Sequence, residues 1–167
     1  MICRVDGKAP FSKPSGSLKG VQVKWLSSGG SFHALDHFGH LALIETNFVA
    51  MIRRHLSGHE NPVGLATDLD GTPRTREQMF AVVHAMTEEY QRDHREDSLS
   101  RVVSLTANAR GETLRLLSEL SDEQLDEPLP GAPWADGTIG GVLGANANHA
   151  RMHWKWACDA GLLEDVP

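Results

Sequence analysis

Cysteine, aromatic residues and long apolar runs are all scarce in this chain of 167 residues. Its two cysteines, Cys3 and Cys158, are far apart and form no CxxC motif, so we expect neither a disulfide framework nor a cysteine-liganded metal site. No apolar run is long enough to span a membrane, and the N-terminal residues contain no apolar segment of the signal-peptide kind. These absences predict a cytoplasmic protein without a membrane partner.

Basic residues are outnumbered by acidic ones. The chain has 16 Lys and Arg against 22 Asp and Glu, which gives a formal net charge of −6. Binding to nucleic-acid phosphates depends on clustered basic side chains, so we expect no nucleic-acid partner. The content of hydrophobic residues, 40%, is that of an ordinary globular protein, and the length suits a domain with a substantial core.

Residues 1–30 differ in composition from the rest of the chain. They are rich in glycine and proline and hold five basic residues against one acidic residue, Asp6. Because this composition does not sustain a helix, we expect an irregular basic arm over residues 1–30, followed by a helical domain over residues 31–163. The alternation of Val21, Val23 and Trp25 with polar residues favours a short strand within the arm.

Beyond the arm, apolar residues recur at the spacing of amphipathic helices. We expect helices over residues 31–57 and 75–95, from Ser98 or Ser100 to about Leu120, and from Asp136 or Thr138 to Gly161. A capping box at Ser121–Gln124 predicts a short helical turn between the last two. The helix at 31–57 is apolar on nearly every side, which places it at the centre. The predicted fold class is therefore all-α, a four-helix bundle.

Histidines gather on two of these helices. His149 and His153 are four residues apart, so they share one helix face, and they belong to an apolar stripe that should point inward. His37 and His40 lie on a polar stripe of the helix at 31–57, which favours a lined cavity. The HxxxH spacing suits two ligands of one metal ion, but it equally suits two buried histidines that are hydrogen-bonded to other groups.

Three segments together resemble the DinB-like (YfiT-like) metal-binding four-helix bundle family, over roughly residues 31–163. They are Gly39-His40-Leu41-Ala42 with Glu45, the segment Leu114–Leu125, and Asn148-His149 through His153 with the glycine stop at Gly161. The resemblance implies that His40, His149 and His153 bind a divalent metal ion, with His37 as the competitor for the first position. Members of the family begin with a helix that the arm at residues 1–30 does not provide. The bundle would then be completed by the helix at 75–95, by the arm or by a partner chain.

The resemblance also implies a chemistry. Family members include thiol S-transferases and a thiol-dependent isomerase, and a related group hydrolyses reactive electrophiles. We expect a metal-dependent enzyme that activates a low-molecular-weight thiol as cosubstrate against an electrophilic small molecule. The alternatives are a metal-water hydrolase and a bundle that binds a metal or small ligand without turnover.

Zinc is the expected ion, and nickel or iron also suits imidazole ligands. Asp36 is a candidate hydrogen-bond acceptor behind His40. No further catalytic residue is predicted. We expect the loops at 59–74 and 126–136 to shape the pocket, and the apolar helix at 31–57 to leave a face that a homodimer covers.

Overall fold

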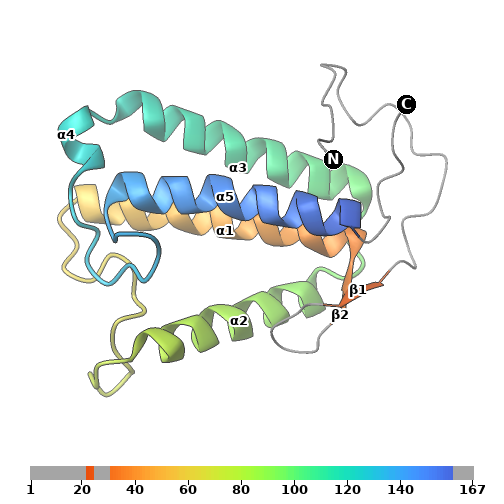
Figure 1. Cartoon of the computed structure of the whole chain (residues 1–167), viewed down its shortest axis with the longest axis horizontal. Coiled ribbons are helices and arrows are strands. Elements are labelled where there is room, and N and C mark those ends of the chain that lie inside the picture. The colour runs from red at the N-terminus through yellow and green to blue at the C-terminus, as the bar shows by residue number, and fades with distance from the viewer. Residues whose placement is uncertain (1–21, 25–30, 160–167) are drawn as a thin grey trace.

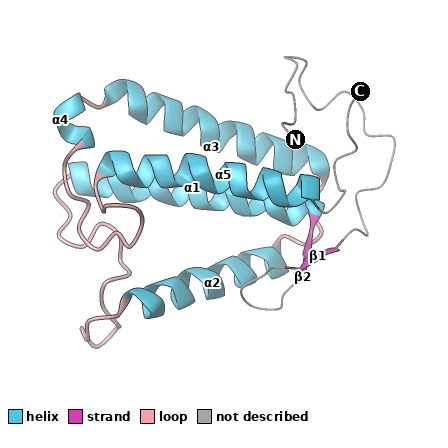
Figure 2. Cartoon of the chain, in the orientation of Figure 1, coloured by secondary structure: helices cyan, strands magenta, loops and turns pink. Residues whose placement is uncertain are grey.

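The computed structural model describes residues 22–24 and 31–159, with side chains described from residue 36 to residue 155. Two short strands, β1 (Gln22–Lys24) and β2 (Ser31–His33), pair antiparallel with Val23 opposite Phe32. Five helices follow: α1 (Ala34–Leu56), α2 (Arg76–Asp93), α3 (Leu99–Glu119), α4 (Asp122–Leu125) and α5 (Ile139–Asp159). The fold is thus a helical bundle preceded by a small hairpin (Figures 1 and 2). The proposed division into an arm of residues 1–30 and a domain of residues 31–163 stays a prediction.

Helix α1 is the central element of the bundle. It packs most extensively against α3, then against α5, and also against α2, which explains why its sequence is apolar on nearly every side. The chain runs in one direction along α1 and α3 and in the opposite direction along α2 and α5 (Figure 1). The helix expected at 75–95, α2, packs against α1 and is one of the helices of the bundle.

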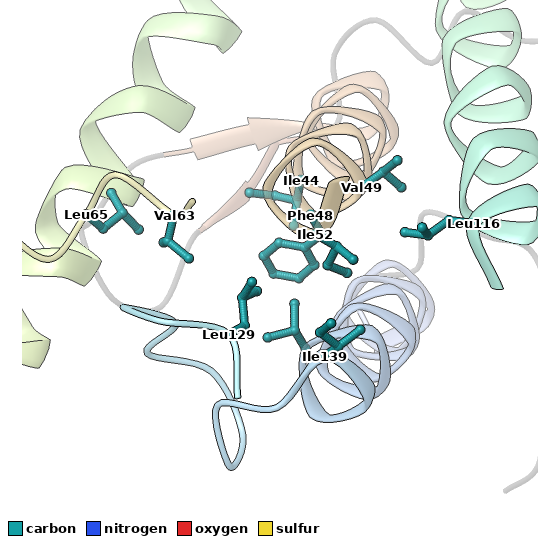
Figure 3. Packing of buried hydrophobic residues seen from close by; sticks show 10 residues of the cluster. Ile44, Phe48, Val49, Ile52, Val63, Leu65, Leu116, Leu129 and Ile139 are labelled. Atoms are coloured by element: carbon teal, nitrogen blue, oxygen red, sulfur yellow. The ribbon is translucent and has the colours of Figure 1, made fainter. Parts of the chain in front are cut away.

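The hydrophobic core lies beside the C-terminal half of α1 (Figure 3). Ile52 of α1, Leu116 of α3 and Ile139 of α5 are completely buried there. The two long loops contribute as well, since Val63 and Leu129 belong to the same cluster. These loops therefore close one end of the bundle as parts of its core.

Capping residues set most helix boundaries where the sequence predicts them. Thr75 begins α2 with a capping box to Gln78, and Ser98 caps α3. Ser121 forms the predicted capping box with Gln124 at α4. One boundary differs from the expectation: the first helix begins at Ala34, because Ser31–His33 pair with β1 and so are not available to start it.

The glycines at the start of α5 allow a neighbouring segment to approach closely. A β-carbon added at Gly140 would lie 3.1 Å from the carbonyl oxygen of Leu125. The neighbour is thus the short α4 and its end, which packs across the first turn of α5.

Core packing gives the first testable prediction. Replacement of the buried Leu116 by Ala should lower the free energy of unfolding by about 2–5 kcal/mol, because it removes apolar contacts and leaves a cavity between α3 and α1. The measurement is urea denaturation followed by circular dichroism. The control is Leu69→Ala, at a fully exposed loop leucine, which should change stability by less than about 0.5 kcal/mol. Equal effects of the two substitutions would contradict this description of the core.

Candidate metal centre

The histidines of α1 and α5 meet at one end of the bundle. His37 and His40 lie in the first third of α1, whereas His149 and His153 lie in the second half of α5. Because the two helices run antiparallel, these segments lie side by side (Figure 1). The loops at 59–74 and 126–136 follow the end of α1 and precede the start of α5, so they lie at the opposite end. The expectation that these loops shape the pocket at the histidines was therefore wrong.

Three of the four imidazoles converge through their Nε2 atoms. The Nε2 atom of His149 lies 3.2 Å from that of His40 and 3.0 Å from that of His153. One ligand nitrogen from each ring can be chosen so that all three lie within 4.8 Å of one another. His40 and His153 are buried, and His149 is partly buried. The structure thus brings together the three residues that the family resemblance singles out.

This spacing matches a set of metal ligands. Nitrogen atoms placed about 2.0–2.1 Å from a tetrahedral zinc ion are about 3.3–3.4 Å from one another, close to the two short distances at His149. Hydrogen bonding alone fits less well, because a neutral imidazole nitrogen carries either one hydrogen or one lone pair. His149 Nε2 would then satisfy only one of its two neighbours. A cation that accepts three lone pairs would account for both contacts, so these residues could hold a metal ion.

Electrostatics keep the three rings neutral. Burial, together with the smaller effects of the nearby His149, His37 and His84, lowers the pKa of His40 to about 3. Burial also lowers the pKa of His149 to about 4 and that of His153 to about 2. At neutral pH all three rings therefore lack the extra proton, and the lone pairs that a metal ion requires are present.

His37 occupies a different place from the three converging rings. Its Nδ1 atom lies 2.7 Å from Nδ1 of His153, on the side of that ring away from the shared Nε2 atoms. Of the two candidates on α1 for the first ligand, the geometry therefore favours His40. Asp36 lines a small cavity with Gly39 and Tyr90, and its charge raises the pKa of His37, although burial has the larger and opposite effect.

Sequence reasoning missed one histidine near this centre. His84 lies on α2, and its charged form would lower the pKa of His40, which places it close to that ring. The only sequence signal was its position beside the inward-facing Val82 and Val83.

Glu45, which belongs to the family motif, has a structural place. Its carboxylate is buried, and Oε1 lies 3.3 Å from Nε of Arg110 on α3. The motif thus contributes a ligand candidate, His40, on one side of α1 and an ion pair to α3 on another. Cys3 and the side chain of Cys158 lie outside the described part of the chain.

A helical bundle with three histidine nitrogens converging between two antiparallel helices defines a class of candidate metal-binding bundles. The comparison with family models identifies that class further, because the model of the DinB superfamily matches residues 16–157. The chain therefore belongs to the DinB superfamily. The comparisons with curated proteins and with solved structures gave no match. Among the described residues, no helix combines the length and the apolar character needed to cross a membrane.

The lowered pKa values predict how the stability of metal-free protein depends on pH. In the unfolded chain these histidines titrate near 6.5, but in the folded protein they titrate near 2 to 4. Between those values the unfolded state binds more protons, so stability is complete above about pH 6.5 and falls as the pH drops toward 4. Each histidine contributes up to about 1.4 kcal/mol per pH unit.

Urea titrations from pH 7.5 to 4.5, with a chelator present, measure this slope. The His149→Gln variant should have a shallower slope, because it lacks one of the three groups. His59→Gln, at an exposed loop position, is the matched control and should keep the slope of the natural sequence. Parallel curves for all three proteins would contradict the proposed origin of the pH dependence.

Proposed function

We propose that this protein is a metal-dependent enzyme that activates a low-molecular-weight thiol against an electrophilic small molecule, as an S-transferase or isomerase. The observation that carries the proposal is the convergence of three neutral imidazole nitrogens from His40, His149 and His153. Membership in the DinB superfamily supports it. The thiol, the electrophile and the identity of the ion are proposals.

The three histidines would hold the ion from two sides, His40 from α1 and the other two from α5. Three protein ligands are typical of catalytic zinc, because they leave a coordination position for a small molecule. The ion would supply Lewis acidity that favours the deprotonated form of a thiol at neutral pH. We propose zinc, and nickel and iron are the alternatives that imidazole ligands also suit.

The residues of the chain have three tasks in this proposal. The neutral rings give their lone pairs to the ion without competing protons, because burial lowers their pKa values. The packing of α1 against α5 fixes the two sides of the site relative to each other. Asn146 is buried one turn before His149 on the same face of α5, and in this proposal its uncharged amide would orient a polar substrate group. A cytoplasmic location, where small thiols stay reduced, would suit this reaction.

Thiol-dependent turnover tests the proposal. Loss of a halogenated aromatic compound or an epoxide should require both an added thiol from a panel of small thiols and protein loaded with Zn²⁺. Substitution of His149 or His153 by Ala should remove bound metal and lower turnover by more than about 100-fold, since changes behind a ligand alone cost 10–100-fold. Metal content by elemental analysis and turnover are measured on the same samples.

Two control variants keep this test specific. Met152→Ala changes an exposed neighbour of His153 on the same helix and should keep metal and turnover. Cys158→Ser should also keep turnover, because residue 158 is five residues beyond His153 and about 140° around the helix. Turnover that needs metal but no thiol would replace the proposal with hydrolysis. Bound metal without turnover of any compound would favour a binding protein.

We also propose that the chain forms a homodimer with two-fold symmetry. The first reason for this expectation, an uncovered α1, no longer holds, since α2, α3 and α5 pack around that helix. The support comes from α3, where Leu114 is 58% exposed and Leu117 is 42% exposed, one turn apart. Light scattering at micromolar concentration should give the dimer mass, and Leu114→Glu with Leu117→Glu should give the monomer mass. A monomer for the natural sequence would contradict the proposal.

A further inference from the structure

A short hydrogen bond joins the candidate metal centre to a fourth histidine. Nδ1 of His37 and Nδ1 of His153 are 2.7 Å apart, and the two rings meet edge to face with centroids 4.9 Å apart. Both side chains are buried, with exposed fractions of 3% and 1%. The contact therefore lies in the interior of the bundle, between α1 and α5.

We propose that His37 is a positioning residue for the metal centre: it accepts the Nδ1–H of His153 and so holds that ring with its Nε2 lone pair directed at His40 and His149. This inference rests on the metal site of the proposed function. His37 is not one of the three proposed ligands of that site, and its role here is to orient one of them.

The two rings share one hydrogen at this contact. A hydrogen bond between two imidazole nitrogens needs one donor and one acceptor, so one of the two Nδ1 atoms carries a hydrogen and the other a lone pair. If His37 were the donor, a neutral His153 would carry its own hydrogen on Nε2. That hydrogen would point at His149 Nε2, which is only 3.0 Å away, and His153 could not bind a metal ion. Only His37 as acceptor leaves the Nε2 lone pair of His153 available.

The position of the contact supports the acceptor role of His37. It is made to Nδ1 of His153, the ring nitrogen on the side away from His149, so a hydrogen at Nδ1 does not occupy the Nε2 side of that ring. Withdrawal of that hydrogen toward His37 makes the His153 ring a better electron donor at Nε2, as carboxylates do behind zinc-bound histidines.

The position of His37 on α1 adds a geometric effect. His37 and His40 are three residues apart, so they lie on adjacent turns of one helix face. The same helix thus presents one candidate ligand and the group that orients another candidate ligand on α5. The side chain of His153 can rotate about its own bonds, and holding it in one rotamer costs conformational entropy. The hydrogen bond to His37 fixes the ring beforehand, so that metal binding does not have to meet this cost.

A matched pair of variants tests the role. His37→Asn places an amide oxygen near the position of Nδ1 and keeps an acceptor, whereas His37→Leu fills a similar space without one. We expect His37→Leu to weaken Zn²⁺ binding 10–100-fold in a competition titration with a chromophoric chelator. His37→Asn should keep most of the affinity. With Co²⁺ as probe, the visible absorption bands should shift in the Leu variant and stay close to those of the natural sequence in the Asn variant.

A measurement without any substitution accompanies the variants. Long-range ¹H–¹⁵N correlation spectra of histidine-labelled protein report which ring nitrogen of His153 carries the hydrogen. We expect Nδ1–H for His153, in metal-free protein and in protein loaded with Zn²⁺. An Nε2–H form of His153, unchanged Zn²⁺ affinity in His37→Leu, or equal weakening in the Asn and Leu variants would each overturn the proposal.

These outcomes are separable from those of the proposed function. Absence of thiol-dependent turnover would count against the proposed reaction, but affinity and ring protonation would still decide the role of His37. If the natural sequence bound no Zn²⁺, the metal-free spectrum would still decide whether His37 is the acceptor.

Discussion

Imidazole nitrogens lose their hydrogen bonds to water when they are buried, and this loss costs free energy unless partners inside the protein replace the water. Between α1 and α5 the rings form a row of short contacts from His37 to His153, on to His149 and then to His40, which replaces part of the lost hydrogen bonding to water. The row fixes how α1 and α5 face each other at this end. The central position of α1, which packs against α2, α3 and α5, follows from its apolar circumference.

Much of the fold was predictable because the signals are local. Serine and threonine caps mark helix starts, in α2 and α4 together with a glutamine three residues on, so α2, α3 and α4 begin where the sequence indicates. The apolar circumference of α1 predicted its central place. The start of α1 was missed because Ser31–His33 pair with β1. The sequence contains no local signal that strand pairing prevails over helix formation at these residues.

The residues that form the site were predictable from the sequence, but their arrangement was less so. The spacing of His149 and His153, with the family motif at His40, gave the three converging residues. The contact of His37 with His153 joins positions 116 residues apart and depends on how two helices are aligned, which no periodicity within one helix encodes. The same holds for His84, which has no motif around it. The loops at 59–74 and 126–136 were assigned to the pocket because loops commonly carry function, yet here they pack into the core through Val63 and Leu129.

The separation of the histidines along the chain has a consequence for the unfolded state. His40 and His149 are 109 residues apart, so an ion held by both would close a loop that spans most of the protein. In the chain-entropy account, a covalent link that closes a loop of such length stabilises the folded state by about 4–5 kcal/mol. A coordinate bond would be the reversible counterpart of such a link. The folded chain would then be more stable with the ion than without it, and, unlike a disulfide, this link would not be opened by reducing conditions.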